Sequence, residues 1–243
     1  DSVQFTAGTG GGEGDPGSKP DARVFAGTYH GLVQSMPSSS LTSGFVSLKV
    51  TKKGAFTGKL SLGKTKIPLK GRVDSAGIAT IKPQKKKPDV GLQLVFDESG
   101  TGNVTGTATA QNEASLSMFA HRLPVFTTKQ PSPHAGNYTV LLPADQDQGT
   151  GFGTLKVSKT GSAKLAMKIQ DGTTAYHGAS ISANGEWPLH GTFGKTGGAL
   201  LGWVEFQDIP GQSDFSGELE WFSFPTLNGT GSATETIIEV RLD

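Results

Sequence analysis

The chain has 243 residues and a mass of 25.2 kDa, which fits one large all-β domain or two domains of about 100–150 residues. It contains no cysteine, which excludes a disulfide framework, thiolate catalysis and cysteine-ligated metal sites. The net charge of +1 hides an asymmetry: residues 1–130 carry 16 basic and 9 acidic residues, and residues 131–243 carry 6 and 12, giving +7 and −6. Such a polarity can steer association between copies.

The first 22 residues predict an arm ahead of the globular part. Residues 7–20 are rich in glycine with two prolines, the composition of a linker. Before them, Val3, Phe5 and Ala7 alternate with polar residues, and an extended segment of this kind can pair with the open edge of a sheet. These three are our predicted partner-binding residues. No signal peptide precedes Asp1, so either the mature chain is cytoplasmic or a leader or an upstream domain has been removed. The composition, rich in Gly, Ser and Thr and low in charge, favours the second and an extracytoplasmic protein.

Residues 23–130 form the first of two predicted β repeats. Apolar and polar residues alternate over 46–50, 56–62 and 67–73, which is the period of strands with one buried face. Turn signals such as Lys53-Gly54 separate them. A lysine-rich loop then lies between two prolines without interleaved aromatic residues, so we predict no nucleic-acid binding.

Residues 131–243 form the second repeat. The segment Gly151–Gly161 matches Gly44–Gly54, and most of its eleven positions are identical or exchange serine for threonine. Further matches keep the same order and an offset near 107–111 residues. We therefore predict an all-β, internally duplicated antiparallel β-meander, without amphipathic helices. It consists either of two barrel- or sandwich-like units or of one larger barrel closed by both halves.

The paired pattern resembles a family of duplicated β-repeat modules found near the C-termini of large secreted or surface proteins of environmental bacteria. The segments that carry the resemblance are Ala26-Gly27-Thr28-Tyr29, Gly44 to Phe56, Ala120-His121-Arg122, Ala135 to Thr139, Gly185 to Leu189 and Leu200 to Trp203. No activity is established for that family. The resemblance implies an extracytoplasmic location and a repeat architecture, and it implies no reaction.

A carboxylate pair is the strongest catalytic candidate. Glu218 and Glu220 lie two apart on one predicted strand, with Glu205 and Trp203 on a nearby strand. Two carboxylates beside a tryptophan would suit glycoside hydrolysis. The alternation, however, leaves both glutamates on the polar face of the strand, where such residues are solvated. We therefore predict that the chain is not an enzyme.

Metal and cofactor candidates are few. The five histidines show no short metal-ligand spacing, although His177 and His190 could meet across strands. Asp145 and Asp147 stand at i and i+2 in a predicted loop and could hold calcium, but the bidentate glutamate of an EF-hand is missing. Calcium at these two aspartates is the one cofactor candidate.

The aromatic residues of the second repeat suggest a binding surface. Trp203 and Trp221 fit the buried alternation, whereas Trp187 follows a tight turn and precedes Pro188, so we predict that Trp187 is exposed and binds glycan. The leading prediction is a non-enzymatic, extracytoplasmic structural or interaction module. Its partners are other copies of itself or another surface protein, and it could be a self-assembling subunit. The alternative is a carbohydrate-binding module that uses these aromatics.

Overall fold

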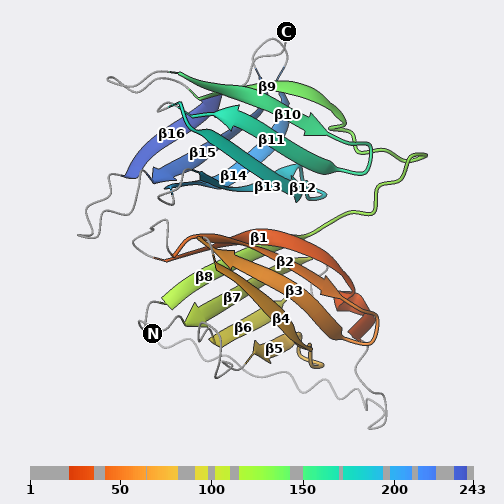
Figure 1. Ribbon diagram of the computed structural model, residues 1–243. Helices are drawn as coiled ribbons and strands as arrows, with labels where there is room; N and C mark the ends of the chain where they lie inside the picture. The colour runs from red at the N-terminus through yellow and green to blue at the C-terminus, as the bar shows by residue number, and fades with distance from the viewer. Residues whose placement is uncertain are drawn as a thin grey trace, which may run out of the picture.

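The computed structural model consists of two curved antiparallel β-sheets and a short 3₁₀ helix, η1 (Ala22–Phe25) (Figure 1). It describes residues 22–35, 42–63, 65–81, 91–97, 102–109, 115–142, 150–169, 172–193, 198–209, 213–222 and 233–239. The N-terminal arm with Val3, Phe5 and Ala7, and the loop with Asp145 and Asp147, lie outside these ranges. No helix in the described ranges is long and apolar enough to cross a bilayer.

The first unit is a single eight-stranded sheet. Its strands are β1 (Gly27–Ser35), β2 (Gly44–Val50), β3 (Ala55–Leu62), β4 (Thr65–Arg72), β5 (Ile78–Ile81), β6 (Gly91–Phe96), β7 (Asn103–Thr109) and β8 (Ser115–Arg122). They are ordered β4-β3-β2-β1-β8-β7-β6-β5, so the first and last strands pair and the sheet is open between β4 and β5.

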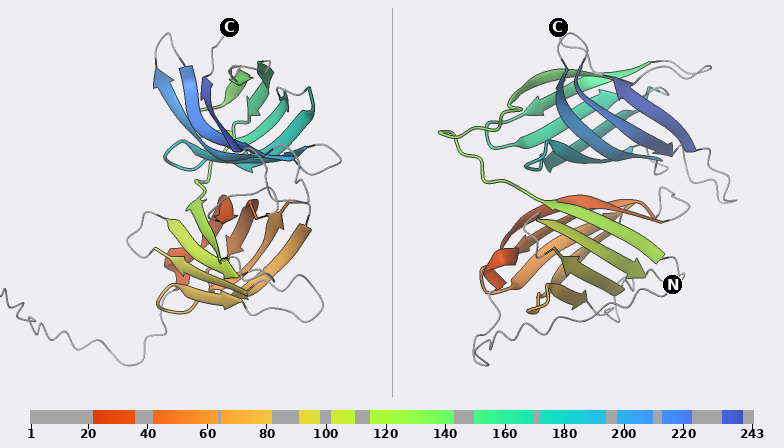
Figure 2. Two further views of the ribbon diagram at one scale, coloured as in Figure 1. Left: turned by 90° about the vertical axis from the view of Figure 1, so that its left-hand side faces the viewer. Right: turned by 180° about the vertical axis from the view of Figure 1, so that it is seen from behind.

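The second unit is a continuous meander. Its strands are β9 (Gly136–Leu142), β10 (Gly151–Val157), β11 (Ser162–Lys168), β12 (Thr174–Ser180), β13 (Glu186–Phe193), β14 (Gly198–Ile209), β15 (Ser213–Phe222) and β16 (Ala233–Glu239). They are ordered as in the sequence, with β9 and β16 at the edges. The edges of each sheet approach one another, so each unit is barrel-like (Figure 2). The predicted fold class is confirmed in its two-unit form.

Each unit encloses its own hydrophobic core. In the first unit the inward residues of alternating strands, such as Val46, Leu48 and Leu94, are fully buried. In the second unit the inward residues, such as Leu155 and Leu165, are buried in the same way. Alternation of buried and exposed positions along nearly every strand explains why the period-two pattern is so regular in the sequence.

The same turn contacts recur in both units. Gly54 N–H donates to Thr51 O and Gly161 N–H to Ser158 O, each at 2.9 Å, and both glycines have φ near +76°. Such a φ favours glycine, which explains why the repeat keeps it. Near the start of the first strand of each unit, a tyrosine hydroxyl donates to the carbonyl four residues earlier: Tyr29 to Phe25 O at 2.7 Å and Tyr138 to His134 O at 2.8 Å.

The strand pairing is weakest at the equivalent place in each unit, between the fourth and fifth strands. Sheet one has no registered pairing between its fourth and fifth strands, because β4 and β5 are its edges. In sheet two the fourth and fifth strands, β12 and β13, are in register only at Tyr176 and Thr192. This split faces the first unit and positions the site described next, since β1 and β2 both contact β13 (Figure 1).

Candidate functional site

The two units pack together through a third hydrophobic cluster. Leu32 of β1 lies with Ala199, Leu201 and Phe222 of the second unit, and all four are buried. These four point outward from their own barrels, on the faces of β1, β14 and β15 that meet. The outward apolar residues are therefore explained by a contact between the repeats, and not by either core.

Phe45 of the first unit reaches the core of the second. It packs against both the inter-unit cluster and the second core. Its ring centroid lies 5.2 Å from that of His30 and 5.3 Å from that of His177, in edge-on contacts. Because β12 and β13 pair at only one registered position, the phenylalanine side chain can enter where a continuous sheet would exclude it.

Two histidines, His30 and His177, contact Phe45, and a third, His190, lies close enough to His177 to feel its charge. Ser180 N–H of the second unit donates to His30 Nδ1 at 3.0 Å, and His177 Nε2 donates to Pro188 O at 2.7 Å. Burial lowers the pKa of His30, His177 and His190 to about 4 each, and for His30 and His190 the charge of His177 is the smaller contribution to this lowering. All three imidazoles are therefore neutral at pH 7, and His30 can accept the inter-unit hydrogen bond.

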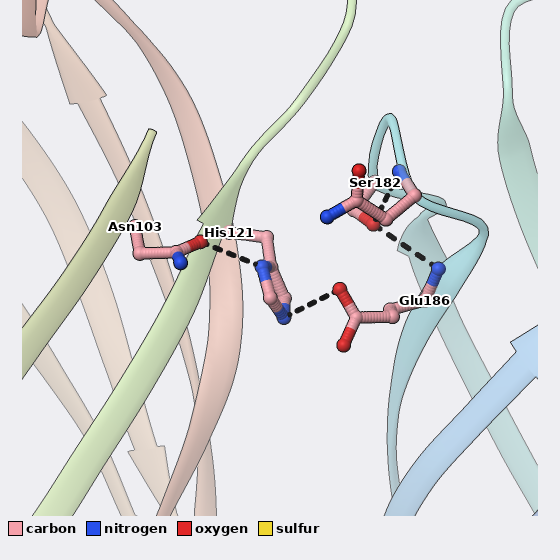
Figure 3. Close-up of polar contacts among 5 residues, drawn as sticks. Asn103, His121, Ser182 and Glu186 are labelled. Carbon is pink, nitrogen blue, oxygen red and sulfur yellow. Dashed lines mark hydrogen bonds and ion pairs between the residues drawn. The ribbon is translucent and has the colours of Figure 1, made fainter. Parts of the chain in front are cut away.

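A fourth histidine bridges the units by a polar contact (Figure 3). His121 Nδ1 lies 2.9 Å from Asn103 Oδ1, and Nε2 lies 3.0 Å from Glu186 Oε2 across the interface, an ion-pair distance without hydrogen-bond geometry. Burial lowers the pKa of His121, and the Glu186 carboxylate opposes this effect. Glu186 N–H donates to Ser182 Oγ at 3.1 Å, so the turn before β13 fixes the backbone from which the carboxylate extends.

The predicted histidine pair is brought together, but without further ligands. His177 and His190 are close enough to influence one another's pKa. Nowhere in the described ranges do three or more His, Asp or Glu side chains form a group that could hold a metal ion. The buried His190 Nε2 also has no hydrogen-bond partner among the described residues.

A groove of about 370 Å³ lies beside the interface, a volume within the range of small-molecule sites. It is lined by Gln34, Leu201, Gly202, Trp203, Glu218, Leu219 and Glu220. Gln34 comes from the first unit, whereas Trp203 and Glu218 face each other on β14 and β15 of the second. The sequence pattern indicated Glu218, Glu220 and Trp203 as candidates, but nothing in it indicated Gln34.

A second hollow of about 550 Å³ lies between the units, where the chain crosses from one to the other. The connecting residues Leu123 to Phe126 line it, together with Lys49 and Arg122. The Arg122 guanidinium donates to Tyr29 Oη at 3.2 Å and also to Val24 O, so it anchors the segment before β1.

The predicted exposure of Trp187 is wrong. Its side chain is 1% exposed in the second core, because on β13 it points inward opposite Val204. Its neighbour Pro188 takes the outward place. Trp221 lies in the core as expected, whereas Trp203 is half-buried, faces outward and packs edge-on against His121 at 4.9 Å. The tryptophan available to a ligand is therefore Trp203.

No family model and no curated protein matches the chain. Among solved structures it aligns with a protein of unknown function from the DUF3598 family of Nostoc punctiforme, at 11% identity and a TM-score of 0.29, over 93% of this chain and 99% of that one. A candidate outer membrane protein from Bacteroides fragilis aligns at 12% identity and a TM-score of 0.27, over 90% and 99%. Alignments this loose assign no function.

Proposed function

We propose that the chain is a non-enzymatic, extracytoplasmic interaction module that binds carbohydrate in the groove at Trp203. The observation that carries the proposal is the composition of this groove, where one aromatic ring, two carboxylates and one amide converge between the units. A location outside the cytoplasm is supported by the low-charge composition rich in Gly, Ser and Thr and by the resemblance to secreted repeat modules.

The groove has the chemistry that sugars need. The face of an indole offers an apolar surface to the C–H groups of a pyranose ring. Glu218 accepts hydrogen bonds from hydroxyl groups, and the Gln34 amide both donates and accepts. Trp203 is also held by edge contacts with Phe119 and His121, at 5.9 and 4.9 Å between centroids, so it is fixed before the ligand arrives.

Affinity electrophoresis and a glycan array test the proposal. We expect Trp203→Leu, which keeps an apolar side chain in the interface, to weaken retention on the best glycan about tenfold, as loss of an aromatic contact does. Glu218→Gln should weaken it less, because the amide still accepts hydrogen bonds. Tyr176→Ala is the matched control, since Tyr176 is 68% exposed in the same unit and lies outside the groove.

Equal retention of wild type and Trp203→Leu would contradict the carbohydrate groove. Hydrolysis of a bound glycan, abolished in Glu218→Gln while the chain stays folded, would contradict the non-enzymatic part. The two results are separable because the first measures retention and the second measures new reducing ends.

A second candidate function is self-assembly into a surface or extracellular structure, which the distribution of charge favours. The strands β3 and β4 present exposed cations outward, namely Lys59, Lys66, Lys70 and Arg72. The strands β14 and β15 present exposed Glu205 and Glu218. Light scattering across a salt series tests a contact between these faces, which should dissociate as salt rises. A particle of monomer mass at every salt concentration would contradict self-assembly.

A further inference from the structure

The first unit docks onto the second through one cross-strand pair. Leu32 and Phe45 are opposite each other on β1 and β2, on the outward face. Leu32 is 4% exposed and Phe45 is half-buried, because the second unit covers them. This pair is the apolar centre of the contact between the repeats.

The second unit carries the same pair, with its leucine half-buried and its phenylalanine exposed. Leu141 and Phe152 are opposite each other on β9 and β10, in the same register with respect to the conserved turn. They are the repeat equivalents of Leu32 and Phe45, since Tyr138 corresponds to Tyr29 and Gly151 to Gly44. Here, however, Phe152 is 57% exposed. The phenylalanine of this pair therefore packs against the other unit in the first repeat and faces solvent in the second.

We propose that Leu141 and Phe152 form a docking surface for the first unit of a second copy of this chain. This apolar contact is an alternative to the contact between the charged faces, with the opposite dependence on salt, and it is independent of the carbohydrate groove. Phe45 enters the second unit where its fourth and fifth strands separate. In the part of the chain that the structure describes, the fourth and fifth strands of the first unit, β4 and β5, are the edges of sheet one, so the equivalent opening there is the acceptor that every copy would offer.

The surroundings of the acceptor suit an apolar contact. Val95 on β6 is 43% exposed, and its partner in register, Ile78, lies on β5 beside the opening. The pair and its acceptor lie on different units of the chain, so repeated contacts of this kind produce closed rings, the smallest being a two-fold dimer, or open filaments. Lys168 lies opposite Phe152 and Lys70 lies on β4, so like charges flank the contact. Salt should therefore strengthen this assembly.

Light scattering over a concentration series, at low and high salt, tests the proposal. For the wild-type chain we expect a mass that rises with concentration and is larger at high salt. Phe152→Ser should raise the apparent dissociation constant about tenfold or more, as loss of a central apolar anchor does. The matched control is Tyr176→Ser, because Tyr176 is the other strongly exposed aromatic on this face of sheet two. It should assemble as the wild type does.

Cross-linking locates the contact, because the chain has no cysteine of its own. Leu141→Cys and Thr80→Cys are purified separately, and Thr80 is on β5 at the acceptor. Mixed, they should form a dimer with a short bismaleimide, and Tyr176→Cys mixed with Thr80→Cys should not.

Three results would overturn the proposal. One is a wild-type chain that stays monomeric at its highest soluble concentration. Another is a Phe152→Ser variant that assembles as the wild type does. If that assembly dissociates as salt rises, the contact is made instead by the cations of β3 and β4 and the glutamates of β14 and β15. The third is Phe152→Ser that loses glycan retention while assembly is unchanged, which would make the pair a sugar-binding surface.

Discussion

Replacing His30 with asparagine should remove part of the acid sensitivity of the fold. The imidazole is neutral in the folded chain and accepts the Ser180 N–H across the interface. Burial, reinforced by His177, lowers its pKa from 6.5 to about 4. As pH falls from 6.5 towards 4, the unfolded chain binds a proton at this position and the folded chain does not, so stability is lost in that window. At about 1.4 kcal/mol per pH unit, one such histidine accounts for about 3 kcal/mol.

Urea unfolding at pH 7.5 and pH 4 measures this difference. Asparagine keeps an acceptor near the position of Nδ1, so His30→Asn should be close to wild type at pH 7.5. It should lose about 3 kcal/mol less than wild type on acidification. The same change at the half-buried His134 should alter the pH dependence less. If wild type and His30→Asn lose equal stability, His30 is not held neutral at this contact and the reasoning fails.

Two further substitutions test the packing. Gly31→Ala should lower the free energy of unfolding in urea by about 3 kcal/mol, because the new Cβ would lie 2.0 Å from the backbone oxygen of Phe119. Gly178→Ala is the control: the nearest atom to its Cβ lies at 3.8 Å, so the loss should be less than about 1 kcal/mol. Equal losses would contradict the close approach of β1 and β8. Phe45→Ala should lower the free energy of unfolding by about 2 kcal/mol, which is half the loss for a fully buried phenylalanine. A loss below about 0.5 kcal/mol would show that Phe45 does not anchor the units.

The sequence predicted the strands well because most of them have one solvent-exposed face and one buried face. Residues 46–50 and 164–169 alternate strictly, and their buried faces are as expected. The same rule failed at the interface, where outward residues are also buried. Leu32 sits in an unbroken run of buried residues on β1, and Trp203 looked like a core residue. When both faces of a strand are buried, apolar and polar residues no longer alternate along the sequence. The sequence pattern therefore could not show which strands form the contact between the repeats.

One available signal was missed. The repeat alignment pairs Phe45 with Phe152, and an outward phenylalanine kept in both copies of a duplication needs an explanation outside the core. Trp187 failed for the opposite reason, because the turn before it suggested exposure while the strand register turns its side chain inward. Local turn signals place a residue along the chain, but only the pairing of strands decides which face it occupies.

The groove and the histidines belong to one interface, so the proposed glycan binding should depend on pH. Gln34 comes from the first unit and Trp203 from the second, so the complete groove exists only while the units are packed together. The inter-unit hydrogen bond to His30 requires an unprotonated ring. Glycan retention should therefore weaken as pH falls from 6.5 towards 4, and His30→Asn should retain glycan at a lower pH than wild type does. Retention that stays constant while the unfolding free energy falls would show that the groove lies within the second unit alone.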